Sequence, residues 1–181
     1  MNRRLTVAIA ATAALGVLAP AAGAAPKKNE IRIVGGPVFK AGKFIKDDVR
    51  FNENTTVKSG GTVKVVNKGS VKAGPHTVTL VKKSALPTTL AKAELCFEMK
   101  GVCGPLAAAH QLDPATQEPK VPLFDAGAEG FGTMGDDKQA GDSVFFPPGR
   151  GTSFKVTAKK GSVLTFFCAV HPWMQGKISV N

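Results

Sequence analysis

The amino-acid sequence is poor in the residues on which much enzyme chemistry depends. Its 181 residues include three histidines, three cysteines, one tryptophan and no tyrosine. The absence of tyrosine excludes an oxidase that uses a tyrosyl radical, and three histidines are too few for the several metal centres of a multicopper oxidase or a copper nitrite reductase. No serine stands in a nucleophile-elbow sequence, which disfavours a hydrolase. We therefore expect a protein that is not an enzyme.

Long hydrophobic runs are absent except near the N-terminus. Arg3 precedes an apolar run over residues 5–18, and Ala22-Gly23-Ala24 fits the small-residue pattern of a cleavage site. These features predict a signal peptide at residues 1–25. The alternative is a membrane anchor, for which the run is short, because a span needs about 20 residues. We expect a single domain over residues 26–181, exported to the periplasm, the cell envelope or the medium, with no membrane span.

Acidic residues are also scarce. The chain has 13 aspartates and glutamates against 24 lysines and arginines, for a formal net charge of +11. A positive charge of this size favours acidic partner proteins or anionic envelope polymers, although scattered lysines also suit a solvated surface. No stretch resembles a nucleic-acid-binding module. We expect protein partners, no nucleic acid, and a monomer.

Short segments that alternate apolar and polar residues, separated by glycine turns, indicate an all-β fold. The expected strands lie at residues 31–34, 55–58, 62–67, 76–80, 152–157, 163–168 and 175–180, with a further one from 143. Residues 83–142 differ, because 88–99 have helical spacing and the remainder is rich in proline and glycine. The pattern predicts a β-sandwich with a long, partly helical insertion at 83–142.

The odd number of cysteines gives one thiol a separate role in an exported protein. Cys96 and Cys103 are close enough in sequence to form a disulfide, which leaves Cys168 free. A continuous helix over both would hold their Cα atoms about 10 Å apart, too far for a bridge. Gly101 and Gly104-Pro105 are expected to end the helix in time. The alternative is two unpaired thiols in an apolar cluster.

Sulfur and nitrogen side chains near the C-terminus form a metal-binding pattern. Cys168, His171 and Met174 lie within seven positions, and His76 begins an upstream strand-like segment. Two imidazoles, one thiolate and a weakly held thioether are the ligand set of a blue-copper electron-transfer site. Taken singly, each has a structural alternative: a partnered polar histidine, a core cysteine or a packing methionine. Together they predict that His76, Cys168, His171 and Met174 bind one copper ion per chain, as Cu(I) or Cu(II).

Three motifs carry a resemblance to a known family. They are Val57-Lys58-Ser59-Gly60-Gly61-Thr62-Val63, Gly74-Pro75-His76-Thr77-Val78 and Cys168-Ala169-Val170-His171-Pro172-Trp173-Met174-Gln175-Gly176-Lys177. With them, residues 50–81 and 143–181 resemble the cupredoxins, and among these the amicyanins and plastocyanin-like bacterial proteins. The resemblance implies a cupredoxin-like Greek-key β-sandwich, with His76, Cys168, His171 and Met174 as ligands of a type 1 copper.

The chain departs from the family pattern at three positions. Thr77 stands where asparagine is frequent, Ala169 where serine or threonine is frequent, and Val170 where proline is common. The first two neighbours usually tie the ligand loop to the other strand, so we expect that tie to be altered while copper binding is retained. The insertion at 83–142 is longer than in the simplest cupredoxins and is a candidate for partner specificity.

Two functions fit such a site. The first is an exported one-electron carrier between envelope redox partners, with His171 at the surface as the exit route beside Trp173, which alternatively is a core residue. The second is copper storage, delivery or tolerance. That class usually carries extra methionine or histidine clusters, and here the methionines beyond the signal peptide are at 99, 134 and 174. We favour the electron carrier; a fold that has lost copper is disfavoured by the intact ligands.

Overall fold

The computed structural model describes residues 29–52, 54–113, 115–116, 118–127 and 129–181. The signal peptide expected at residues 1–25 lies outside the described residues. Within them, no helix is both long enough and apolar enough to cross a membrane.

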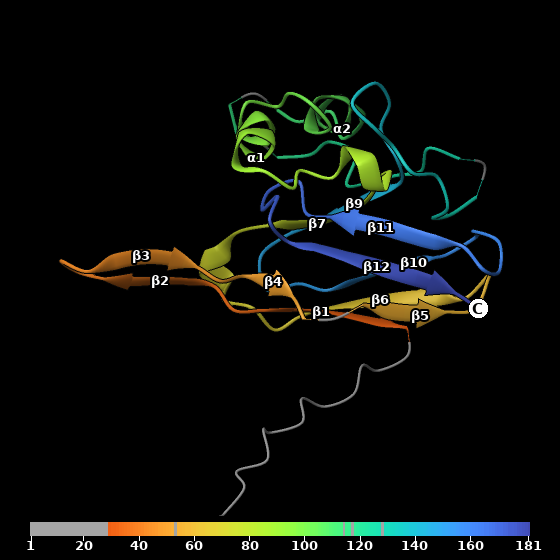
Figure 1. Ribbon diagram of the computed structural model, residues 1–181, viewed down its shortest axis with the longest axis horizontal. Helices are drawn as coiled ribbons and strands as arrows, with labels where there is room; N and C mark the ends of the chain where they lie inside the picture. The colour runs from red at the N-terminus through yellow and green to blue at the C-terminus, as the bar shows by residue number, and fades with distance from the viewer. Residues whose placement is uncertain (1–28, 53, 114, 117, 128) are drawn as a thin grey trace, which may run out of the picture.

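Two β-sheets and a separate hairpin contain the strands (Figure 1). One sheet has four strands in the order β10-β6-β1-β4, the other has six in the order β5-β12-β11-β7-β9-β8, and β2 pairs with β3. The bounds are β1 Glu30–Val34, β2 Pro37–Lys40, β3 Phe44–Asp47, β4 Arg50–Phe51, β5 Thr55–Val57, β6 Thr62–Asn67, β7 His76–Leu80, β8 Leu123–Phe124, β9 Ser143–Phe146, β10 Thr152–Lys155, β11 Val163–Phe167 and β12 Gln175–Val180. The predicted all-β sandwich is confirmed.

Alternation along the strands creates the core between the sheets. In β6, Val63 and Val65 are buried while Thr62 and Lys64 are exposed, which is the pattern of a strand with one wet face. β7 is instead buried along its whole length, because its outer face is covered as well. This difference matters for the site, since β7 begins with His76.

The insertion covers that outer face. Its helices, α1 (Leu90–Phe97) and α2 (Cys103–Ala109), lie above β7, β9 and β11 in Figure 1. Two short 3-10 helices, η1 (Val71–Ala73) and η2 (Lys83–Ala85), flank β7. α1 ends at Phe97, and left-handed backbone at Gly101 helps to turn the chain before α2. The turn brings Cys96 and Cys103 together in a disulfide, so the predicted bridge is confirmed.

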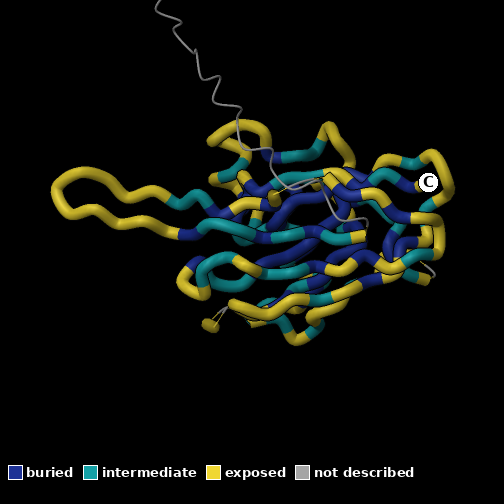
Figure 2. Tube along the Cα trace, turned by 90° about the horizontal axis from the view of Figure 1, so that it is seen from below, coloured by how far each residue is buried: buried dark blue, intermediate teal, exposed yellow. Residues whose placement is uncertain are grey.

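The β2–β3 hairpin is a feature that the sequence analysis did not predict. It projects beyond the sandwich (Figure 1), and residues 37–46 are all exposed, as the yellow extension in Figure 2 shows. Sequence periodicity finds strands by their buried face, and this hairpin has none.

Candidate metal centre

Two neighbouring strands bring three metal-binding side chains together. His76 is the first residue of β7, and Cys168 follows Phe167, the last residue of β11. The strands pair antiparallel with Phe167 opposite Thr79, so the start of β7 lies beside the end of β11. His171 follows in the loop that leads to β12. In the part of the chain that the structure describes, His76, Cys168 and His171 are the cluster able to hold a metal ion.

The donor atoms are spaced for a single ion. Cys168 Sγ lies 3.9 Å from His76 Nδ1 and 3.7 Å from His171 Nδ1, and the three donor atoms lie within 4.8 Å of one another. Bonds of about 2.0 Å to nitrogen and about 2.3 Å to sulfur, as in zinc sites, place the two donors roughly 3.5–3.8 Å apart at tetrahedral or trigonal angles. One ion of this size therefore fits between all three side chains.

The residues that follow the cluster favour copper over structural zinc. A structural zinc site takes a further cysteine or histidine as its fourth ligand. Here the candidate for the fourth ligand is Met174, which is buried in the same core cluster as Cys168. The Met174 N–H donates to the His171 carbonyl at 2.8 Å, and the Cys168 N–H donates to the Met174 carbonyl at 3.0 Å. The loop is thus closed on itself by its own backbone. Two histidines and one cysteine with a methionine suit copper.

Burial sets the protonation of the three donors. It lowers the pKa of His76 to about 4, with a smaller contribution from His171, and it also lowers the pKa of His171. Burial raises the pKa of the Cys168 thiol, against hydrogen bonds that include those from Thr77. Near neutral pH the imidazoles are therefore neutral, the form that binds metals, and the thiol releases a proton when a metal binds.

Thr77 ties the ligand loop to β7. Its backbone N–H donates to Cys168 Sγ at 3.3 Å, and its hydroxyl oxygen accepts from the Ala169 N–H at 2.8 Å. The residues at 77 and 169 predict an altered tie, because alanine at 169 has no side-chain hydroxyl and threonine replaces the frequent asparagine at 77. The structure retains a tie in a different form, because the backbone of Ala169 supplies the donor.

The tie continues outward as a chain of buried hydrogen bonds. The Thr79 hydroxyl donates to Thr77 Oγ1 at 3.1 Å and lies 2.7 Å from Ser143 Oγ. Ser143 Oγ is 2.8 Å from His110 Nε2, and His110 Nδ1 is 2.6 Å from the Val121 carbonyl. His110 is 3% exposed. The sequence alone gave His110 no part in the copper site. The hydrogen bonds that connect His110 to the site run from the insertion through Ser143 in β9 to Thr79 and Thr77 in β7.

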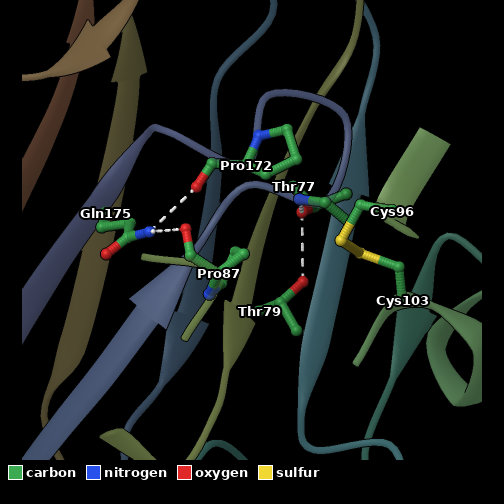
Figure 3. Close-up of a disulfide and its surroundings, with 8 residues drawn as sticks. Thr77, Thr79, Pro87, Cys96, Cys103, Pro172 and Gln175 are labelled. Atoms are coloured by element: carbon green, nitrogen blue, oxygen red, sulfur yellow. Dashed lines mark hydrogen bonds between the residues drawn. A yellow bond between two sulfur atoms is a disulfide. The ribbon is translucent and has the colours of Figure 1, made fainter. Parts of the chain in front are cut away.

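The disulfide of the insertion packs near the start of the ligand loop. Cys96 and Cys103 belong to an apolar cluster that contains Phe167 and against which Ala169 packs. Figure 3 shows the disulfide near Thr77 and Thr79, with the Gln175 side chain reaching two backbone carbonyls. The Gln175 amide donates to Pro87 and Pro172, each at 3.0 Å. The insertion thus braces both ends of the loop.

His171 is less accessible than expected. It is 6% exposed, whereas Trp173 is 47% exposed. The two rings meet edge to face with centroids 5.3 Å apart, and Trp173 Nε1 donates to the Val49 carbonyl at 3.1 Å. The expectation of a surface His171 is therefore wrong; the Trp173 ring packs against it. Of the two alternatives for Trp173, the structure shows the exposed one.

Comparison with known proteins gives structural neighbours. No protein-family model and no curated protein matches the chain. Solved structures that match include auracyanin A from Chloroflexus aurantiacus (20% identity, 84% of this chain and 98% of that chain, TM-score 0.39). Another is a purple cupredoxin from Nitrosopumilus maritimus (16% identity, 84% of this chain and 98% of that chain, TM-score 0.36). A third is amicyanin from Paracoccus versutus (18% identity, 90% of this chain and 85% of that chain, TM-score 0.34). These structures are blue-copper proteins and cupredoxins by name, the kind of protein that the motifs resemble. Identities and TM-scores this low carry no residue roles across, so membership of that family stays a resemblance.

Proposed function

We propose that this chain is an exported type 1 blue-copper protein that carries single electrons between redox proteins of the cell envelope, with residues 26–181 as one domain. The observation that carries the proposal is the buried cluster of His76, Cys168 and His171, with donor atoms within 4.8 Å of one another. A bound copper would supply a one-electron couple at that point.

Each ligand has a distinct part. His76 and His171 offer Nδ1, Cys168 offers its thiolate, and Met174 is the weak fourth ligand in the pattern typical of blue copper. The Thr77 N–H donates to Cys168 Sγ, which orients the sulfur and limits its charge.

Rigidity supports electron transfer over other roles. The cluster is buried, and the loop is held by the Thr77, Met174 and Gln175 hydrogen bonds, none of which uses a metal-ligating side-chain atom. Ligands that are fixed and shielded from water move little when the charge at the site changes, and small rearrangement is what rapid electron transfer requires.

The route to a partner leads through Trp173. Its ring touches His171 edge to face and is half exposed, so it connects the buried imidazole with the surface. Residues 26–181 carry 22 lysines and arginines against 13 acidic residues, a net charge of +9, which favours an acidic redox partner.

A test should separate a carrier from a protein that delivers copper. The mature chain loaded with Cu(II) is reduced and reoxidised repeatedly in the presence of an excess of the Cu(I) chelator bicinchoninate. We expect the copper to stay bound and the absorption spectrum to return after each cycle. His171→Ala, which removes one ligand, is the control that should lose copper. Transfer of copper from the unmodified chain to the chelator on reduction would favour storage or delivery instead.

A further inference from the structure

The β2–β3 hairpin carries apolar side chains that the fold does not use. Phe39 pairs with Ile45 across the two strands, and these side chains are 74% and 79% exposed. Val38 and Phe44, one position away along their strands, lie on the opposite face and are 47% and 49% exposed. A group of exposed apolar side chains such as this one marks a surface that binds another protein, a membrane or a ligand.

The same hairpin is positively charged. Residues 37–46 contain Lys40, Lys43 and Lys46 and no aspartate or glutamate. Lysines close to an anionic membrane are attracted to it, and aromatic or aliphatic residues beside them enter the boundary between headgroups and acyl chains. A partner protein would cover one face of the ribbon, whereas a lipid surface surrounds a projecting tip on both faces.

From these observations we propose that the β2–β3 hairpin docks the protein on an anionic lipid surface. The base of the hairpin, not its tip, leads to the segment that contacts Trp173. Asp47 ends β3, and Val49 follows with the carbonyl that accepts from Trp173. Docking therefore brings the exposed Trp173 edge toward the membrane, where a membrane-bound redox protein can approach it.

Vesicle sedimentation of the copper-loaded chain tests this. Vesicles of equal parts phosphatidylglycerol and phosphatidylcholine are compared with vesicles of phosphatidylcholine alone. We expect binding to the first kind, and about tenfold weaker binding for Phe39→Ser/Ile45→Ser. The matched control Leu90→Ser changes another exposed apolar residue and should bind as the unmodified chain does.

Charge is tested with a second pair of variants. Lys40→Gln/Lys46→Gln should weaken binding, and Lys159→Gln/Lys160→Gln, in an exposed turn elsewhere, should weaken it less. Failure of the unmodified chain to bind anionic vesicles overturns the proposal. A second outcome also overturns it: the unmodified chain is a dimer in solution and the Phe39→Ser/Ile45→Ser variant is a monomer. The hairpin would then bind a second copy of the chain and not a lipid surface.

A separate inference comes from the hydrogen-bond chain between His110 and Cys168, and it rests on the proposed function. The Val121 carbonyl can only accept, so His110 Nδ1 carries a proton. A neutral His110 then has no proton on Nε2, and Ser143 donates to it. Thr79 must donate to Ser143, and the Thr77 hydroxyl to Thr79. The hydroxyl protons of Ser143, Thr79 and Thr77 are then all donated within this chain of hydrogen bonds. Cys168 Sγ accepts only from the Thr77 backbone N–H.

A cationic His110 reverses the order. Nε2 donates to Ser143, Ser143 to Thr79, and Thr79 to Thr77, whose oxygens lie 3.1 Å apart. The Thr77 hydroxyl proton is then free for another acceptor. We assign Cys168 Sγ as that acceptor, because the backbone N–H of the same residue already donates to it at 3.3 Å.

We infer that His110 is a positioning residue whose proton determines, through Ser143, Thr79 and Thr77, how many hydrogen bonds the copper-binding thiolate accepts. One proton is taken up at Nε2, three hydroxyls rotate, and no covalent bond to carbon or sulfur changes. A further hydrogen bond withdraws charge from the thiolate, which favours Cu(I) and raises the reduction potential.

The surroundings of His110 permit this titration. It lines, with Thr77 and Glu118, a cavity of about 720 Å³ between the insertion and the sandwich, from which water can supply the proton. Burial lowers its pKa, against the Val121 carbonyl. The charged groups on the segments around it are Asp113, Glu118, Lys120 and Asp142. The Asp142 carboxylate already accepts three backbone N–H groups.

The reduction potential of the copper-loaded chain is measured against pH. We expect it to rise as pH falls through the pKa of His110, with a limit of tenfold in the Cu(I) preference per pH unit, which is 59 mV for one electron. His110→Gln and Ser143→Ala should both lose this rise; Ser143→Ala keeps His110 but breaks the chain. The same rise in all three proteins assigns it to the ligand histidines and overturns the inference.

Nuclear magnetic resonance of the metal-free chain gives an independent readout. Neutral His110 should carry its proton on Nδ1; a proton on Nε2 instead contradicts the inference. If no thiolate–copper absorption forms at all, the proposed function fails, and the protonation of His110 still tests the hydrogen-bond chain.

Discussion

Replacement of Thr77 by valine tests how the ligand loop is held. Valine has nearly the shape of threonine but no oxygen, so the Ala169 N–H loses its acceptor at 2.8 Å and the Thr79 hydroxyl loses one partner at 3.1 Å. The backbone N–H of residue 77 still donates to Cys168 Sγ. The variant therefore removes the side-chain tie and leaves the metal ligands in place.

The expected cost follows from which groups are left without partners. The Thr79 hydroxyl keeps Ser143, so its loss is small. The Ala169 N–H keeps none of its protein partners. A fully buried donor left unpaired costs about 1–3 kcal/mol, and this donor is part-buried, so the low end of that range applies. We expect Thr77→Val to lower the free energy of unfolding of the metal-free chain by about 1 kcal/mol in urea titrations.

Thr77→Ser is the matched control, because serine keeps the hydroxyl that Ala169 uses. If Thr77→Val and Thr77→Ser differ by less than about 0.5 kcal/mol, the hydroxyl does not hold the loop and the reasoning is refuted.

Three further predictions use the same urea assay on the metal-free chain. Cys96→Ser/Cys103→Ser, which opens a seven-residue separation, should cost about 2.5 kcal/mol from loop-closure entropy; an unchanged midpoint contradicts this. The pKa of His76 falls from 6.5 to about 4 on folding, so the unfolded chain takes up the proton first. Stability is complete above about pH 6.5 and decreases toward pH 4, by roughly 3 kcal/mol at most; His76→Gln should flatten that slope. Gly176→Ala should cost about 1–3 kcal/mol, because its Cβ would overlap the buried Phe166 ring; a neutral effect means that β11 and β12 are less closely packed.

The sequence was informative where a side chain's type decides its place. Alternation identified the buried face of β6, whereas β11 is buried on both faces. The Cys168–Met174 spacing marked the loop of the candidate site. The disulfide was predicted because glycines interrupt the helix between Cys96 and Cys103, as the structure confirms. The structure brings His76, Cys168 and His171 together; that they and Met174 bind copper stays a prediction.

Features built from backbone groups or from distant contacts were missed. The tie at Ala169 uses a backbone N–H, which every residue type except proline offers, so residue identity did not reveal it. His110 reaches the site through Ser143 and Thr79, which are far apart in sequence. The β2–β3 hairpin has no buried face, and so it lacks the signal that marks strands in a sequence.

The most direct test of the central claim is the absorption and electron paramagnetic resonance spectrum of the mature chain after addition of Cu(II), recorded beside Cys168→Ser. We expect one copper per chain with an intense blue thiolate-to-copper band, which mild reductant bleaches and which the variant lacks. Weak, colourless copper binding that the variant shares would contradict it.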